Sequence, residues 1–246
     1  MVRKAIVPLL LASVLLSGCC CPWSVRRAIR SVSVSGSGQL VTKEFDFDQF
    51  TAVNVSHAFK ADIVQAERYS VVITIDDNLV QYLKVEQRGS VLYISLDDLS
   101  WTGDATLRAQ VTLPNLQALE ASGASQVSLS GFQPSRRFDM EVSGASSIRG
   151  ELNGADLKLR ISGASTVTLD GEGANADIGV SGASRARLEN LVLHDVDVEA
   201  TGASTAVVNV AGRLNAEASG ASNIQYLGNP SLGKVVESGA SSVRPR

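Results

Sequence analysis

A four-residue motif, Ser-Gly-Ala-Ser, recurs along the second half of this 246-residue chain. Its seven copies begin at residues 122, 143, 162, 181, 201, 219 and 238, and the copy at 201 has Thr as its first residue. Successive copies are therefore separated by 21, 19, 19, 20, 18 and 19 residues. A nearly constant repeat of about 20 residues is typical of a solenoid, in which each repeat forms one coil stacked on the previous one. The motif predicts the architecture of the chain and says little about its chemistry.

Around each motif, apolar residues recur at every second position with mostly polar residues between them. The series through the copy at 143 is Phe138, Met140, Val142, Gly144, Ser146 and Ile148. This period of two predicts half-buried β-strands and excludes helical repeats. A Gly within such a series predicts a tight bend or a close approach of two backbones. Two orientations stay open: either the last Ser of each motif points inward and hydrogen-bonds within the stack, or the bend turns the Ala inward.

Strands, tight bends and a constant repeat together predict an all-β fold, a right-handed parallel β-helix with coils of about 19–20 residues. The predicted hand follows from the strong preference of parallel crossover connections. Neighbouring coils would lie about 4.8 Å apart, so that the motifs form straight ladders along one corner. We predict a structural role in this repeat for the motif glycines, which are Gly123, Gly144, Gly163, Gly182, Gly202, Gly220 and Gly239.

The N-terminus has the pattern of an exported lipoprotein. Arg3 and Lys4 precede a 12-residue apolar run over residues 5–16, which is shorter than the roughly 20 residues that span a membrane. The run ends in Leu16-Ser17-Gly18-Cys19, which resembles a lipobox, whose Cys is acylated and becomes the new N-terminus. We therefore predict a signal peptide over residues 1–18 and lipidation of Cys19; the alternative is an ordinary secretory signal. Because Cys20, and not Asp, follows, resemblance to Gram-negative lipoproteins indicates the outer membrane.

All three cysteines, Cys19, Cys20 and Cys21, lie at this junction, so the folded region can hold neither a disulfide nor a Cys-ligated metal. Residues 19–40 are rich in Arg, Ser and Gly and predict a lipidated tether. Residues 41–121 and 122–246 then form one continuous domain. We expect the first part to be an N-terminal cap and the first coils, because it holds eight of the twelve aromatic residues against three in 122–246, and terminal repeats are atypical.

Within residues 41–121, Asp76-Asp77-Asn78 predicts the start of a capped helical turn. The segment Gln87-Arg88-Gly89-Ser90 predicts a hairpin turn.

Two further segments of this part, together with the repeat, resemble a known family. They are Phe47-Asp48-Gln49-Phe50-Thr51-Ala52-Val53-Asn54-Val55 and Val71-Val72-Ile73-Thr74-Ile75-Asp76-Asp77-Asn78-Leu79. In order and spacing, and followed by repeated Ser-Gly-Ala-Ser-x-Val, they resemble the auto-transporter adhesin, head GIN domain family of bacteria over about residues 40–243. The resemblance implies a β-helical fold and an envelope location, and it brings no catalytic residues.

Candidates for catalysis or metal binding are few. His57 and His194 are the two histidines, and neither has a Cys or a second His near it in sequence, so we expect exposed loop residues. Acidic groups could bind calcium through their oxygens; these are Asp76-Asp77, Asp97-Asp98, and the series Asp195, Asp197 and Glu199. That series shares one outward strand face, which favours a solvated surface. We predict no catalytic residue, no metal site and no cofactor.

Charge does not favour a nucleic-acid partner. From residue 19 onward, 20 Lys and Arg stand against 25 Asp and Glu, a balance of −5. We predict a protein anchored to the outer membrane through its N-terminal lipid, with a non-enzymatic binding or scaffold role toward an envelope glycan or protein, adhesion included. The alternative is a polysaccharide-active β-helical enzyme, which a charged cluster in a groove across several coils would favour.

One ladder of the repeat could itself contact a polysaccharide through hydroxyl groups, although small residues at a tight corner explain it more simply. It consists of Ser122, Ser143, Ser162, Ser181, Thr201, Ser219 and Ser238.

Overall fold

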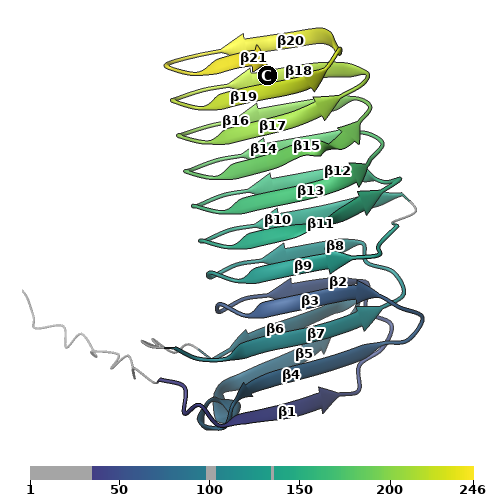
Figure 1. Cartoon of the computed structure of the whole chain (residues 1–246), viewed down its shortest axis with the longest axis vertical. Helices are drawn as coiled ribbons and strands as arrows, with labels where there is room; N and C mark the ends of the chain where they lie inside the picture. Colours follow the sequence, from purple (N-terminus) through teal and green to yellow (C-terminus); the bar gives the residue numbers. More distant parts are fainter. Residues whose placement is uncertain (1–34, 98–103, 134–135) are drawn as a thin grey trace, which may run out of the picture. The chain divides into compact units, whose positions relative to one another are not determined.

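The computed structural model describes residues 35–97, 104–133 and 136–246, and the predicted signal peptide and Cys19 lie outside them. The described strands belong to one compact unit, residues 32–246, and form two sheets (Figure 1). In spatial order, sheet A consists of β1 (Leu40–Phe45), β4 (Ser70–Asp76), β7 (Leu107–Leu113), β3 (Lys60–Gln65), β9 (Gln126–Ser130), β11 (Ser147–Asn153), β13 (Thr166–Glu172), β15 (Arg185–Leu193), β17 (Thr205–Val210), β19 (Asn223–Gly228) and β21 (Ser242–Pro245).

Sheet B lies opposite sheet A, across a shared core. In spatial order it consists of β5 (Leu83–Arg88), β6 (Val91–Leu96), β2 (Ala52–Val55), β8 (Ala118–Ala121), β10 (Arg137–Val142), β12 (Asp156–Ile161), β14 (Ala176–Val180), β16 (Val196–Ala200), β18 (Arg213–Ala218) and β20 (Ser231–Glu237).

From β8 onward each coil has the same plan: one strand of sheet B, the motif, one strand of sheet A, and a turn back to sheet B. Strands of successive coils pair in parallel, as β10 does with β12 from Arg137↔Asp156 to Val142↔Ile161. The parallel β-helix predicted from the repeat is therefore confirmed, and its coil is flattened onto two sheets. Each coil consequently has two narrow edges, the motif edge, formed by the Ser-Gly-Ala-Ser turns, and the variable edge opposite to it.

The period of two fixes the core between the sheets. Inward residues of both sheets are buried, among them Phe138, Met140 and Val142 of β10 and Ile148 of β11. The large aromatic side chains Phe50 and Phe59 fill the core of the N-terminal part. Because alternate residues point outward, each sheet presents a solvent-facing outer surface of regularly spaced side chains.

The motif turns settle which residue of the repeat points inward. The last Ser of the motif is buried in six copies, whereas the Ala of the copy at 143 is exposed. The Oγ of Ser146 accepts a hydrogen bond from the N–H of Ser125 at 3.2 Å, and the Oγ of Ser165 accepts one from Ser146 at 3.3 Å. The first of the two orientations is therefore correct, because a buried hydroxyl finds a partner on the neighbouring coil.

The coils of residues 41–121 do not stack in chain order. The coil of β2 and β3 lies between the coil of β8 and β9 and the coil of β6 and β7. The chain therefore descends from β3 to the cap and returns past its own first coil. The antiparallel strands β1, β4 and β5 close this end, which agrees with the expectation of an atypical terminal region.

A 3₁₀ helix, η1 (Asp77–Tyr82), and the turn that joins β5 to β6 lie in this cap. The predicted helical turn and hairpin turn are confirmed, but the predicted side-chain cap is wrong, because Asp76, the residue at the cap position, makes no cap hydrogen bond. The buried Asp76 carboxylate instead accepts hydrogen bonds from the N–H groups of Gly38 and Thr106, both at 2.7 Å. It thereby ties two distant segments to the cap.

Candidate functional site

The outer face of sheet B carries two parallel rows of side chains that run along the solenoid, perpendicular to the strands. The register of neighbouring strands fixes their members. The first row is Val91, Ala52, Ala118, Asp139, Lys158, Asp177, Asp197 and Asn215, and the second is Tyr93, Asn54, Glu120, Glu141, Arg160, Gly179, Glu199 and Glu217. We call these the sheet B rows.

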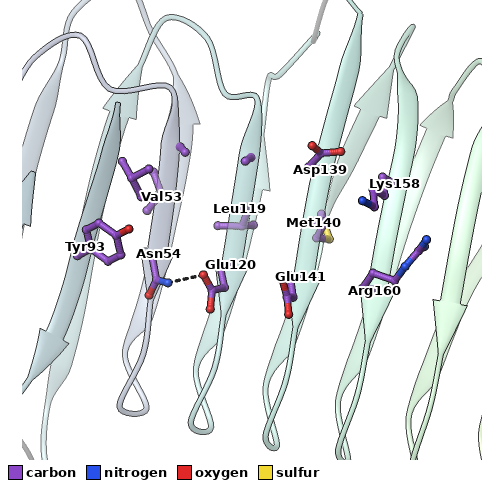
Figure 2. A pocket seen from close by; sticks show the side chains of 13 residues that line it. Val53, Asn54, Tyr93, Leu119, Glu120, Asp139, Met140, Glu141, Lys158 and Arg160 are labelled. Atoms are coloured by element: carbon purple, nitrogen blue, oxygen red, sulfur yellow. Dashed lines mark hydrogen bonds between the residues drawn. The ribbon is translucent and has the colours of Figure 1, made fainter. Parts of the chain in front are cut away.

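A groove of about 430 Å³ opens where the first row consists of small residues. Ala52 and Ala118 are among the residues that line it, and so is Tyr93, which Figure 2 shows on the leftmost of the labelled strands. Figure 2 shows that Glu120 and Glu141 lie side by side in the second row. The groove arises because short side chains on two neighbouring strands leave an indentation in a row that is otherwise mostly charged.

Hydrogen bonds and ion pairs fix several polar groups around the groove. The Nδ2 of Asn54 donates to Oε2 of Glu120 at 2.5 Å. The Arg160 guanidinium forms an ion pair with Asp177 at 2.6 Å and also donates to its backbone carbonyl at 3.0 Å. Arg88 lies over the ring of Tyr93, with Cζ 5.3 Å from the ring centroid. The groove thus combines an aromatic ring, an amide and carboxylates whose positions the sheet holds.

A second hollow, of about 370 Å³, continues the groove along the same face and shares Glu141 and Arg160 with it. It lies over Gly179, where a Cβ would approach the Arg160 side chain within 3.0 Å. The motif residues Ser162, Ser181 and Thr201 border it. Part of the ladder that the sequence offered as a polysaccharide contact therefore lines a real depression.

The two rows are predominantly acidic. From β6 to β18 they hold seven carboxylates against Lys158 and Arg160; the carboxylates are Glu120, Asp139, Glu141, Asp177, Asp197, Glu199 and Glu217. This balance favours uncharged or positively charged ligands over anionic ones. The charged cluster also spans several coils, which is the feature that we expected of the enzyme alternative.

The histidines lie apart from this groove. His194 is at the variable edge, its side chain 70% exposed and its Nδ1 3.2 Å from Oδ1 of Asp195. His57 is at the motif edge with φ 61°, and its Nδ1 lies 2.8 Å from the Oγ of Ser56. The structure brings neither histidine to the sheet B groove.

The acidic groups proposed for calcium are separated as well. Asp195 accepts the Arg213 N–H at 2.7 Å, and Asp197 accepts the Asn215 amide at 2.6 Å. Asp97 pairs with Lys84, and Asp98 falls outside the described residues. Within the described part of the chain, no three His, Cys, Asp or Glu side chains gather as metal ligands would.

The seven motif glycines lie together in one ladder along the motif edge, with φ between 73° and 79°. Sequence reasoning missed an eighth, divergent copy, Ser56-His57-Ala58-Phe59. The N–H groups of Ser122 and Gln126 donate to the carbonyls of Val55 and Phe59, as later copies do to the copy before them. In the sequence, Ser56 and Ala58 follow the apolar Val55 at the positions that Ser and Ala hold in the later copies. This partial match was the signal that could have identified the eighth copy.

Sequence reasoning also missed the groove, because its residues come from strands β6, β2, β8, β10 and β12, which adjoin only through the stacking of coils. Among the residues that the structure describes, no helix is long and apolar enough to cross a bilayer.

Comparison with known proteins agrees with this fold. A family model described as "Putative auto-transporter adhesin, head GIN domain" matches residues 49–230. A crystal structure of a putative adhesin from Bacteroides fragilis is 18% identical, with a TM-score of 0.78 over 87% of this chain and all of that one. A putative adhesin from Parabacteroides merdae is 21% identical, with a TM-score of 0.66 over 87% of this chain and 99% of that one.

A protein from Parabacteroides distasonis named a putative lipid binding protein is 16% identical, with a TM-score of 0.68 over 87% of this chain and 99% of that one. At these identities the likeness concerns the fold alone. No curated protein matches the chain.

Proposed function

The chain belongs to the auto-transporter adhesin, head GIN domain family, and from that premise we propose that it is an outer-membrane lipoprotein with a non-enzymatic binding role in the cell envelope. Its ligand in this proposal is an extended glycan, uncharged or amino-bearing, that lies along the sheet B groove. The name adhesin, which similar solved proteins carry, is consistent with such a role.

The groove is the observation that carries this proposal. A linear sugar chain needs a long, shallow site, and the two adjoining hollows extend across strands β6 to β16. The half-buried Tyr93 ring, with an apolar face and a polar tip, suits the alternating apolar and hydroxyl surfaces of a sugar. The Asn54 amide and the Glu120 and Glu141 carboxylates supply acceptors for hydroxyl or ammonium groups beside that ring.

The test of ligand binding is a glycan array with the fragment 32–246, which contains the whole compact unit, followed by calorimetry on the best uncharged or amino-bearing glycan. Tyr93→Ala should weaken its binding about tenfold, the value of roughly one stacking contact. Thr168→Ala, on the opposite sheet, is the matched control and should bind as the unmodified fragment does. If the fragment captures no such glycan, or if both variants lose affinity equally, the groove is not the site.

The lipid anchor has a separate test. Cys19→Ala should abolish incorporation of labelled fatty acid and release the protein from the membrane fraction. Persistent label on that variant, or a wild-type protein found solely in the soluble periplasmic fraction, would contradict the anchor without affecting the groove.

One observation favours a second candidate function, hydrolysis of a polysaccharide. Glu120 and Glu141 are register partners on neighbouring strands within the groove, and pairs of carboxylates catalyse glycoside hydrolysis. Both residues are exposed, whereas a general acid is usually held in a less hydrated site. Release of reducing ends from a bound glycan, abolished by Glu141→Gln with binding retained, would replace the binding role by a catalytic one.

A further inference from the structure

The outer face of sheet A differs in charge from that of sheet B. The two rows nearest the motif edge run from β4 to β21 in continuous register. They hold the cations Lys60, Arg108, Arg149, Arg185, Arg187 and Arg244, all exposed. Among the described residues from β4 to β21 these rows hold one carboxylate, Asp62, and at the cap the same row continues to Glu44 of β1. We call this surface the basic stripe.

The cations of the basic stripe have no acidic partner within ion-pair distance among the described residues. On sheet B, by contrast, Arg160 pairs with Asp177 at 2.6 Å and Lys234 with Glu217 at 2.5 Å. Ion pairs therefore engage these two cations of sheet B, whereas no such pair within the described part of the chain engages the six cations of the basic stripe. Exposed cations without counter-charges attract anionic ligands and release counterions when they bind them.

The other members of the two rows are mainly hydroxyl and amide side chains, which donate hydrogen bonds to oxyanions and sugar hydroxyls. Thr166 and Thr168, on β13, lie between Arg149 on β11 and the two arginines of β15. Nearer the cap, Lys60 and Arg108 are register partners beside a hollow of about 380 Å³. The stripe thus offers two cationic clusters separated by neutral donors.

The spacing of the cations matches a linear ligand. Lys60 on β3, Arg149 on β11 and Arg187 on β15 are successively two strands apart, which is roughly 10 Å for strands spaced about 4.8 Å apart. A narrow array of this kind, spread over two adjacent rows, fits a polymer that carries acidic groups at intervals along its length. A membrane surface would not require such alignment. Binding of single-stranded nucleic acid would favour aromatic residues for stacking, which these two rows lack among the described residues.

We propose that the basic stripe of sheet A binds a linear acidic polysaccharide, carboxylated or sulfated, along the solenoid axis. This proposal does not depend on the sheet B groove, because the two surfaces lie on opposite sheets. A protein with both surfaces would connect two different glycans.

The test measures binding of the fragment 32–246 to polygalacturonate and to dextran sulfate, with uncharged dextran as the negative control. Binding to at least one polyanion should weaken as salt rises from 50 to 200 mM, by about tenfold or more. Arg185→Gln combined with Arg187→Gln should lower affinity about tenfold and make the dependence of log affinity on log salt less steep by one to two. Arg213→Gln combined with Lys234→Gln, at exposed positions of sheet B, removes the same charge and should change little.

Far-UV circular dichroism and thermal unfolding of both double variants establish that each has folded. The proposal fails if the unmodified fragment binds neither polyanion, or if both double variants lose affinity equally, since net charge alone would then explain binding. It also fails if the fragment prefers anionic phospholipid vesicles or double-stranded DNA to both polysaccharides at equal salt. In a further variant, Asp62→Asn, loss of the carboxylate should tighten binding, and weaker binding would contradict the stripe.

Discussion

At both narrow edges of the solenoid the chain turns from one sheet to the other, but the two edges differ in how much room they leave for side chains. At the motif edge, backbones of successive coils touch. The N–H of Ala183 donates to the carbonyl of Gly163 at 2.7 Å, and that of Ala203 donates to Gly182 at 2.8 Å. A Cβ added to Gly182 would lie 2.5 Å from the Gly163 carbonyl oxygen, so there is no space for any side chain.

At the variable edge, backbone hydrogen bonds also join successive coils, as from the Gly212 N–H to the His194 carbonyl at 2.9 Å, and side chains add further bonds. The Asp156 carboxylate accepts the Asn175 N–H at 3.0 Å, and Asn175 in turn accepts the Asp195 N–H at 3.3 Å. Gly154 also has a positive φ, 85°, yet a Cβ there would meet nothing within 4 Å. This edge therefore tolerates turns of different length and composition.

The difference teaches that the most repeated feature of the sequence serves the scaffold. Close backbone contact restricts the motif to small residues and repeats the same restriction at every coil. The surfaces that vary from coil to coil, the sheet B groove and the basic stripe, lie on the broad faces between the edges. Function in such a solenoid is therefore sought mainly among the outward residues of the strands, although the first residues of three motifs also border the second hollow.

The largest loss of stability is expected for Gly182→Val, in the middle of the glycine ladder of the motif edge. Positive φ disfavours a β-branched residue and the added atoms would overlap the preceding coil, so the free energy of unfolding should fall by roughly 3–5 kcal/mol. Urea unfolding of the 32–246 fragment measures it. A loss below about 1 kcal/mol, as at an ordinary surface position, would mean that the motif edge is a surface loop.

Gly239→Val places the same side chain in the last coil. Its Cβ would also meet a backbone oxygen, that of Gly220 at 2.7 Å. However, β20 and β21 are the end strands of their sheets. The last coil therefore has a single neighbouring coil and can unfold by separating from it. The expected loss is roughly 1–3 kcal/mol, because solenoid stability is approximately a sum of neighbour terms. A loss as large as at Gly182 would show that the coils do not unfold stepwise.

Ser184→Ala probes the buried side of the motif edge. The Oγ of Ser184 accepts the N–H of Ser165 at 3.3 Å, so its removal leaves a buried donor unpaired and should cost roughly 1–2 kcal/mol. Ser181→Ala, in the same motif but only partly buried, is the control and should stay within about 0.5 kcal/mol. Thermal unfolding compares the two, and equal effects would remove the distinction between inward and outward serines.

The smallest effect is expected at the variable edge. His194→Ala removes a side chain that is 70% exposed and contacts Asp195, and exposed pairs of this kind contribute less than about 1 kcal/mol. The change in unfolding free energy should be within about 0.5 kcal/mol. A larger loss, seen in the same urea titration, would mean that this edge also depends on specific contacts.

Local pattern was enough to predict much of this fold. The period of two identified strands such as β10 and β11, and turn chemistry identified the helical turn and the hairpin of the cap. Local pattern could not identify the insertion of the β2 coil between later coils, since β2 pairs with β8 across more than sixty residues of sequence. It also could not find the role of Asp76, whose partners Gly38 and Thr106 lie far along the chain.

The functional surfaces were beyond sequence reasoning for the same physical reason. Ala52 and Ala118 line the groove together because they are register partners, and Lys60 lies beside Arg108 because β3 pairs with β7. Neither pair shows a recognisable spacing in the chain. The alternation of inward and outward residues predicted which side chains would be exposed, but not which of them would be neighbours.

The central claim is that the glycines of the motif edge have no room for a side chain, whereas the variable edge has open positions such as Gly154. It has one direct test. Gly182→Ala and Gly154→Ala both place alanine at a positive φ, 74° and 85°, but only the first meets a neighbouring coil. Urea titration gives the free energy of unfolding of each variant. Because both positions have a positive φ, the cost of that backbone conformation cancels when the two values are compared. The account predicts that Gly182→Ala loses about 2 kcal/mol more than Gly154→Ala, the size of an overpacking penalty. Equal losses in the two variants would contradict it.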